Sequence, residues 1–111
     1  MIELEDRVFT ALADANRRRL LTRLAQSSPK TATQLAREFP ISRQGIVKQL
    51  DLLAQARLVQ VQTRGREKQY LFDPTSLQTA SAWIETIGQQ WDERLQQLKQ
   101  FLEEDGSSQI E

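Results

Sequence analysis

Residues 41–50 read ISRQGIVKQL, and this stretch decides the fold. Its apolar side chains, Ile46 and Leu50, lie one helical turn apart. Its long polar side chains fall on the opposite side of the same helix and are Arg43, Gln44 and Lys48. The stretch therefore predicts an amphipathic helix that exposes a row of hydrogen-bonding side chains.

The boundaries of this helix are also readable. Ser42 is a favourable N-cap, and the pattern continues through Leu53 to about Ala56. Upstream, TATQ at residues 31–34 is typical of a capping box, in which Thr31 and Gln34 satisfy each other's backbone amides. That box predicts a shorter helix over about 32–39, because Pro40 disfavours helix at the residue before it.

After Arg57 the hydrophobic period changes from helical to alternating. LVQVQT and EKQYLF are two β-type runs on either side of RGR, whose Gly65 supplies the positive φ that a hairpin turn needs. Two helices joined by a tight turn and followed by a hairpin describe a winged helix-turn-helix. We therefore expect a mainly α fold with a small β-hairpin, a helix-turn-helix over about 31–56 and a wing over about 58–72.

Two more helices precede this unit. Apolar spacing predicts the first over about 3–13, and Asp14 can cap the second, in which Leu20, Leu21 and Leu24 face inward. Three arginines, 17–19, stand at the start of the second helix, where positive charge is mildly unfavourable. We expect them to form an internal salt bridge, with Asp14 or Glu38, rather than to contact phosphate.

The last helix begins with Asp73 as cap and Pro74 in its first turn, and we expect it to run to about Glu104. About 30 residues span roughly 45 Å, which exceeds the diameter of a compact domain of this size. We therefore predict that this helix and the first one form a dimer seam. The predicted seam residues share an apolar heptad-like spacing and are Leu4, Val8, Leu77, Ile84, Ile87, Trp91, Leu95, Leu98, Phe101 and Leu102.

The alternative is a helix folded back on its own core. On either reading residues 1–104 form one domain, and residues 105–111 form a polar tail.

The charge distribution favours a polyanion as partner. The net charge of the 111 residues is zero, but residues 17–68 hold twelve basic and three acidic side chains, a net charge of +9. The rest of the chain holds three basic and twelve acidic side chains and has a net charge of −9. Segregation on this scale favours a surface that binds a polyanion; with the winged helix-turn-helix, we expect double-stranded DNA as this partner.

Composition also excludes several classes of protein. The chain has no cysteine and no histidine, so it lacks the usual general base and the commonest metal ligands. It shows no phosphate-binding glycine loop and no carboxylate pair at catalytic spacing, and we expect no enzyme, no cofactor and no metal site. No apolar run is long enough for a membrane span, and the acidic N-terminus carries no signal sequence. We expect a cytoplasmic protein.

The candidate DNA contacts follow from the helix wheel and the wing. Arginine and glutamine can make paired hydrogen bonds to guanine and adenine edges in the major groove. We assign this readout to the recognition helix, at Ser42, Arg43, Gln44, Gly45, Val47 and Lys48. Gly45, without a side chain, is expected to permit close approach to the DNA backbone. We assign phosphate contacts to the wing, at Arg64, Arg66 and Lys68. We assign further phosphate contacts to the start of the helix before the recognition helix, at Thr31 and Thr33.

Two alternatives stand beside this assignment. An exposed helix face and a charged turn are common solubilising features in any protein. A winged helix can also serve as a protein-interaction module without direct DNA readout.

The stretches VFTALADANRRRLLTRL, TATQLAREFPISRQGIVKQLDLLAQARLV and TRGREKQYLFDP together resemble the ArsR/SmtB family of bacterial winged-helix repressors. The resemblance covers about residues 7–74, and the long final helix suits that family's dimerising helix. It implies a homodimer that represses transcription from an inverted-repeat operator. It also implies base contacts at Arg43, Gln44, Val47 and Lys48.

The chain departs from the family pattern at several positions. Metal sensors of the family carry cysteines on the helix that here reads ATQLAREF, or Asp and His on the last helix, so the resemblance implies no metal sensing here. Arg57 stands where the family often has glycine, and a left-handed conformation there would cost about 1 kcal/mol. The sequence identifies no effector, and both a small molecule and a protein stay open.

Overall fold

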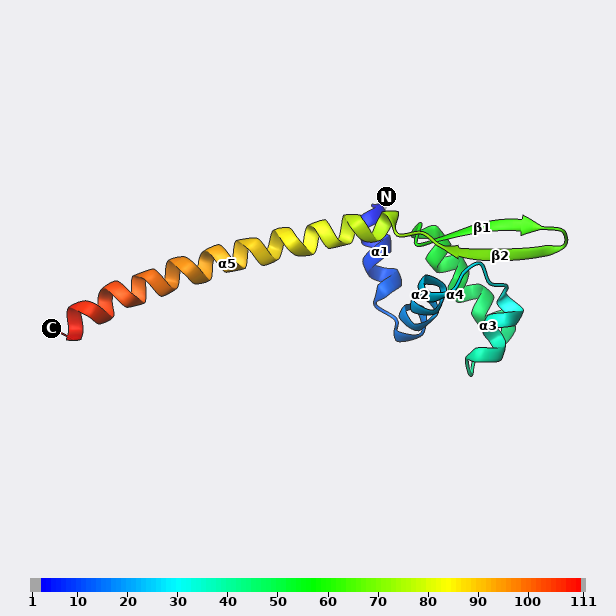
Figure 1. Ribbon diagram of the computed structural model, residues 1–111, viewed down its shortest axis with the longest axis horizontal. Coiled ribbons are helices and arrows are strands. Elements are labelled where there is room, and N and C mark those ends of the chain that lie inside the picture. The colour runs from blue at the N-terminus through cyan, green and yellow to red at the C-terminus, as the bar shows by residue number, and fades with distance from the viewer. Residues whose placement is uncertain (1–2, 111) are drawn as a thin grey trace. The chain divides into compact units, whose positions relative to one another are not determined.

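The computed structural model describes residues 3–110, with side chains up to residue 104. The chain divides into two units, Met1–Ala80 and Ser81–Glu111, and each is described by itself. The elements, in chain order, are α1 (Leu4–Leu12), α2 (Ala15–Gln26), α3 (Ala32–Glu38), α4 (Arg43–Gln55), β1 (Val59–Arg64), β2 (Glu67–Phe72) and α5 (Thr75–Ile110) (Figure 1). The predicted fold class is confirmed: mainly helical, with one antiparallel hairpin and a long last helix.

The core of the first unit is made by one apolar face of each of α1–α4 and by the base of the hairpin. Its side chains with no exposed surface are Val8, Leu20, Leu24, Leu35, Ile46, Leu50, Leu53 and Leu58. Burial of such a side chain is favourable by about 1.5–3 kcal/mol. This burial fixes which face of each helix is left in solvent.

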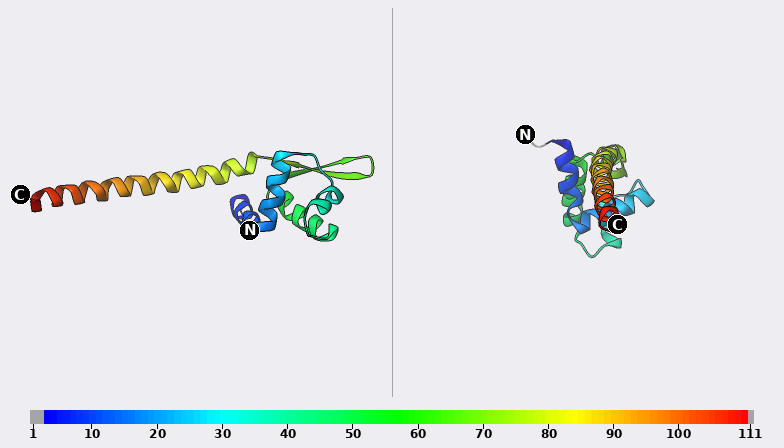
Figure 2. Two further views of the ribbon diagram at one scale, coloured as in Figure 1. Left: turned by 60° about the horizontal axis from the view of Figure 1, so that its bottom comes forward. Right: turned by 90° about the vertical axis from the view of Figure 1, so that its left-hand side faces the viewer.

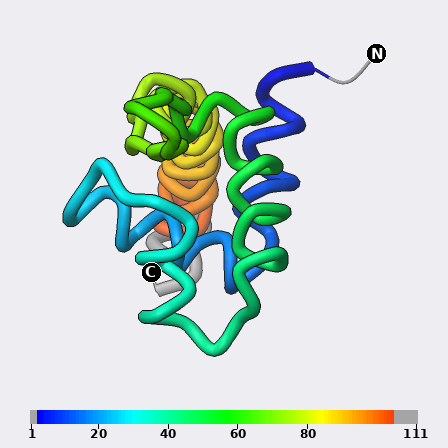
Figure 3. Tube along the Cα trace, turned by 90° about the vertical axis from the view of Figure 1, so that its right-hand side faces the viewer, coloured from blue at the N-terminus to red at the C-terminus, as the bar shows by residue number. Residues whose placement is uncertain are grey.

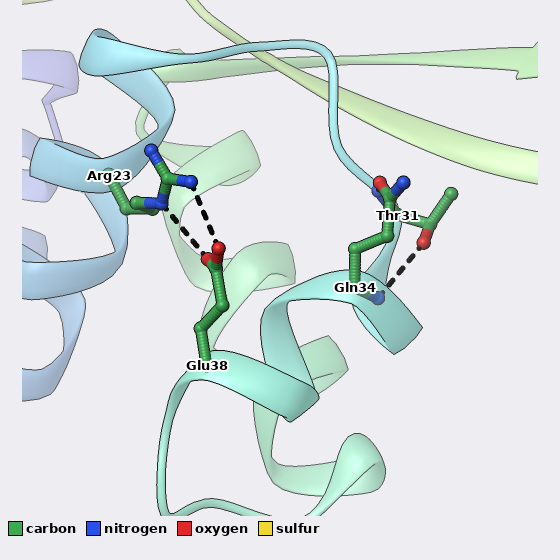
Figure 4. A network of polar contacts seen from close by, with 4 residues as sticks. All are labelled: Arg23, Thr31, Gln34 and Glu38. Carbon is green, nitrogen blue, oxygen red and sulfur yellow. Dashed lines mark hydrogen bonds and ion pairs between the residues drawn. The ribbon is translucent and has the colours of Figure 1, made fainter.

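The predicted N-caps of α2 and α3 are confirmed. The Asp14 carboxylate accepts hydrogen bonds from the amides of Asn16 (2.8 Å) and Arg17 (3.2 Å), and the bond from Arg17 is the main reason that the pKa of Asp14 is low. In α3, Thr31 Oγ1 accepts from the Gln34 amide at 3.1 Å, and Gln34 Oε1 accepts from the Thr31 amide at 2.9 Å (Figure 4). Each pair satisfies backbone N–H groups that a helix start leaves unpaired.

Arg17, Arg18 and Arg19 do not form the expected salt bridge with Asp14 or Glu38. Arg17 donates from Nε to the Ala11 carbonyl (2.8 Å) and from Nη2 to the Thr10 carbonyl (3.1 Å), and Arg18 donates to the Leu12 carbonyl (2.6 Å). They therefore cap the C-terminus of α1, where carbonyl groups lack helical partners.

Glu38 pairs instead with Arg23. The ion pair is bidentate, with Nε–Oε2 3.0 Å and Nη2–Oε1 2.9 Å, and it joins α2 to α3 (Figure 4). Hydrogen bonding from Arg23 holds the pKa of Glu38 below its ordinary value and raises the pKa of Arg23. This ion pair could not be predicted from the sequence, because the two residues meet only after α2 and α3 pack together.

The hairpin is anchored to the helices at its base. Its strands pair from Val59 with Phe72 to Arg64 with Glu67, and Gly65, at φ +65°, makes the turn. Lys30 and Tyr70 exchange two backbone hydrogen bonds of 3.0 and 2.8 Å, which tie β2 to the segment before α3. The tip extends beyond α1–α4 (Figures 1 and 2). The base of the wing is therefore held against the helices, and its tip is exposed to solvent.

The last helix starts one residue later than predicted. The Asp73 carboxylate accepts from the Thr75 amide at 3.0 Å, a bond that is the largest cause of its lowered pKa, and the Pro74 carbonyl accepts from the amide of Gln78. Pro74 therefore lies at the N-cap rather than in the first turn. The helix continues to Ile110, past the end expected at Glu104. The side chains of the expected polar tail, residues 105–111, lie outside the described residues.

Helix α4 ends in a left-handed residue. Arg57 has φ +57°; its amide donates to the Ala54 carbonyl and the Leu58 amide donates to the Leu53 carbonyl, each at 3.0 Å. This is the Schellman pattern, which is most favourable with glycine at the left-handed position. The chain turns here from the recognition helix into the wing.

A Cβ is disfavoured at this φ. We therefore predict that the free energy of unfolding of Arg57→Gly is about 1 kcal/mol higher than that of Arg57→Ala. Both variants remove the same charge, so the comparison isolates the backbone. Urea unfolding followed by circular dichroism measures the difference. Equal stabilities of the two variants would show that the left-handed conformation is not maintained in solution.

Candidate nucleic-acid interface

Helix α4 presents two chemically different faces. Ile46, Leu50 and Leu53 are fully buried, and Val47 is half-buried beside them. Arg43, Gln44 and Lys48, which the sequence placed on the other face, are exposed, as are Ser42, Asp51 and Gln55. The apolar stripe thus turns the long polar side chains into solvent.

The Ser42 cap stabilises the N-terminal end of this helix. Its Oγ accepts a hydrogen bond from the Gly45 amide at 3.1 Å. Ser42 therefore has a structural role at the helix start, where its hydroxyl oxygen already accepts one hydrogen bond in the free protein.

Gly45 has an internal reason for lacking a side chain. A Cβ at this position would lie 2.8 Å from Ile41 Cγ2 and 3.2 Å from Ser42 Oγ. The missing side chain makes room for the turn between α3 and α4. This differs from the expectation that Gly45 serves the approach of DNA, because the space beside it is filled by the protein's own turn.

Several predicted contacts meet in one hollow, which we call the cationic groove. It has a volume of about 640 Å³ and lies between α3, the start of α4 and β2. Its lining residues are Thr31, Ala32, Thr33, Gln34, Arg37, Arg43, Val47, Arg66, Glu67, Lys68 and Tyr70. Four of them are basic and one is acidic, so the groove suits a phosphate backbone.

The groove also shows how Arg43 is held. Its Nε donates to Thr33 Oγ1 at 3.1 Å, across the turn that joins α3 to α4. This bond links a predicted phosphate contact to a predicted base contact. It leaves the terminal nitrogens of the guanidinium available, and Arg43 itself is exposed.

The predicted residues divide between the groove and the surface around it. The groove contains Thr31, Thr33, Arg43, Val47, Arg66 and Lys68, whereas Ser42, Gln44, Gly45, Lys48 and Arg64 do not line it. Arg64, Arg66 and Lys68 are all exposed on the wing. The structure thus brings the returning strand of the wing close to the recognition helix.

Five residues of the groove were not among the predicted contacts: Ala32, Gln34, Arg37, Glu67 and Tyr70. Arg37 is exposed on α3, and only its place one turn after Thr33 could have indicated that it shares a face with that residue. Tyr70 is buried, and burial is the main cause that raises the pKa of its phenol, with the charge of Asp51 adding to it. It therefore carries no charge at neutral pH.

The predicted seam residues differ in their exposure. Six of the apolar side chains between Ile84 and Leu102 are more than half exposed: Ile84, Trp91, Leu95, Leu98, Phe101 and Leu102. Ile87 is half-buried, as are Leu4 and Leu77, and Leu77 packs against the core. Val8 is fully buried in the core of the first unit, so it has no surface to offer to a second copy.

The described part of the chain shows neither a metal-binding cluster nor a helix suited to crossing a membrane. No three acidic side chains of residues 3–104 come together in a way that could hold a metal ion. No helix in the described residues has the length and the apolar character that crossing a bilayer would need.

Known proteins are similar to this chain in sequence and in architecture. A family model described as a helix-turn-helix domain matches residues 12–62. The HTH-type transcriptional regulator Rv2034 of Mycobacterium tuberculosis is 35% identical over 101 residues, which cover 91% of either chain. The transcriptional repressor SdpR of Bacillus subtilis is 32% identical over 77 residues, 69% of this chain and 84% of that protein.

A solved structure agrees. The ArsR-like transcriptional regulator from Rhodococcus sp. RHA1 superposes with a TM-score of 0.80 at 38% sequence identity, covering 87% of this chain and 88% of that one. The likeness therefore extends over most of the chain.

The close contact at Gly45 leads to a stability prediction. Alanine is favoured over glycine in helices by up to about 1 kcal/mol, but the added Cβ would press on Ile41. We expect Gly45→Ala to lower the free energy of unfolding, and to raise it when introduced into an Ile41→Ala background. Thermal and urea unfolding of the four proteins of this double-mutant cycle measure the coupling. A stabilising Gly45→Ala in the parent chain would show that the contact is easily relieved.

Proposed function

Since this chain belongs to the ArsR family of winged helix-turn-helix transcriptional regulators, we propose that it represses transcription as a cytoplasmic homodimer bound to an inverted-repeat operator. It is a DNA-binding transcriptional regulator, in a family of regulators rather than enzymes. The dimer, the operator and the residues that contact them belong to the proposal.

One observation carries the DNA-binding part of the proposal. The exposed end of α4 and the returning strand of the wing share the cationic groove, which holds Arg37, Arg43, Arg66 and Lys68. An α-helix fits the major groove of B-DNA, and basic residues beside it can contact the flanking phosphates. Arg43, Gln44 and Lys48 would then lie at base edges or adjacent phosphates, with Val47 against them.

The dimer part rests on the second unit. Trp91, Leu98 and Phe101 are each more than half exposed, and they lie on one face of a helix whose apolar residues recur every three to four positions. Large exposed apolar stripes on a soluble protein are typically covered by a partner. A twofold axis between the α5 helices of two copies would allow two recognition helices to meet successive major-groove faces, about 34 Å apart.

The proposal predicts a strong salt dependence. If Lys48, Arg64, Arg66 and Lys68 of both protomers contact phosphate, about eight contacts form, and affinity should fall about 10³–10⁵-fold between about 50 and 200 mM salt. We expect Lys48→Ala to reduce the slope of log affinity against log salt by about 2, because each dimer loses two contacts. Arg43→Ala should reduce discrimination between operator and unrelated duplex. Fluorescence anisotropy on the footprinted upstream region measures both quantities.

Lys99→Ala is the matched control, since it removes the same charge from an exposed position of α5. It should leave the slope unchanged. A flat salt response, with operator binding unaltered in Arg43→Ala and Lys48→Ala, would instead favour the protein-interaction module.

A further inference from the structure

A second hollow lies between α1, α2 and α4, and it shares no lining residue with the cationic groove. We call it the α1–α4 hollow. It has a volume of about 220 Å³ and is lined by Arg7, Thr10, Ala11, Arg17, Leu52 and Gln55. Helices α1 and α4 lie side by side here (Figure 3). The regulator function derived above makes no use of this site.

The chemistry of the lining is specific. Leu52 and Ala11 supply an apolar surface, and Leu52 is 37% exposed although it is a large hydrophobic residue. Two guanidinium groups, of Arg7 and Arg17, lie at the same hollow, and no lining residue is acidic. An apolar wall next to two guanidinium groups, with no carboxylate in the lining, complements a ligand with an apolar body and one negative charge.

Three hydrogen bonds hold the guanidinium group of Arg17 in place, and some of its N–H donors stay available. Its three bonds, to the carbonyls of Thr10 and Ala11 and to Gln49 Oε1 (3.0 Å), leave two of the five N–H donors of a guanidinium available. The Arg7 side chain is exposed and makes no hydrogen bond or ion pair with the described residues. A carboxylate can accept hydrogen bonds from both side chains without displacing an existing bond.

We propose that the α1–α4 hollow binds a small organic carboxylate whose apolar body is about the size of a benzene ring. Size supports this class, because an apolar cavity of about 150 Å³ is enough to bind benzene. The ring would lie on Leu52 and Ala11, and the carboxylate would face Arg7 and Arg17. The Thr10 hydroxyl and the Gln55 amide complete the polar rim.

Such a ligand would touch the recognition helix from the side that does not face the cationic groove. Leu52 and Gln55 belong to α4, and Arg17 is bonded to Gln49 on the same helix. The binding step itself requires no DNA, so it can be tested apart from the repressor function.

The test is a titration of the full-length protein with benzoate, followed by two-dimensional ¹H–¹⁵N NMR, with benzamide as the neutral analogue of the same shape. We expect saturable shifts at the amides of Thr10 and Leu52 and at the side-chain amides of Gln49 and Gln55. Arg7→Gln should weaken benzoate binding about tenfold, because it removes a charge-assisted hydrogen bond. Leu52→Gln should also weaken it, by removing the apolar wall. Arg19→Gln, which loses the same charge at an exposed position of α2 outside the hollow, should bind as the parent does.

Three outcomes would overturn the proposal. The first is a set of shifts that never saturates or is equally large with benzamide. The second is saturable binding with shifts confined to the cationic groove, which would place the anion at the DNA interface. The third is parent-like affinity in both Arg7→Gln and Leu52→Gln, each shown by thermal unfolding to be folded.

Discussion

The apolar stripe of α4 fixes where every polar side chain of that helix points. Ile46, Leu50 and Leu53 are fully buried. The helix therefore cannot rotate about its axis without exposing them. Each would lose about 1.5–3 kcal/mol if brought into water. The direction of Arg43 and Lys48 into solvent therefore depends on a hydrophobic constraint on the opposite side of the helix.

The same constraint reaches the wing through short connections. The left-handed Arg57 turns the chain directly from α4 into β1, and the backbone bridge between Lys30 and Tyr70 fastens β2 to the segment before α3. Both ends of the helix-turn-helix are thus tied to the hairpin. This is why Arg66 and Lys68, more than twenty residues after Arg43, line the same groove as it does.

Local signals could be predicted from the sequence, and contacts between distant segments could not. The caps at Asp14, Thr31 and Ser42 involve residues two or three positions apart, so their chemistry is visible in a short window. The partners of Arg17 and Arg23, and the crowding of Gly45 by Ile41, exist only after helices or turns have packed. Val8 was misplaced for a related reason: an apolar residue on α1 fits a core and a seam equally well until its burial is known.

The central claim is that a second copy of the chain covers the apolar face of α5, and sedimentation velocity with and without operator DNA tests it most directly. The account predicts that the parent and Gln89→Glu, a substitution at an exposed polar position, sediment as dimers and bind the operator tightly. Trp91→Glu places the same charge on the apolar face, where Trp91 is 58% exposed in the single chain, and should sediment as a monomer with greatly weakened operator binding. A parent protein that is monomeric and binds the operator with full affinity, or a Trp91→Glu variant that stays dimeric, would contradict it.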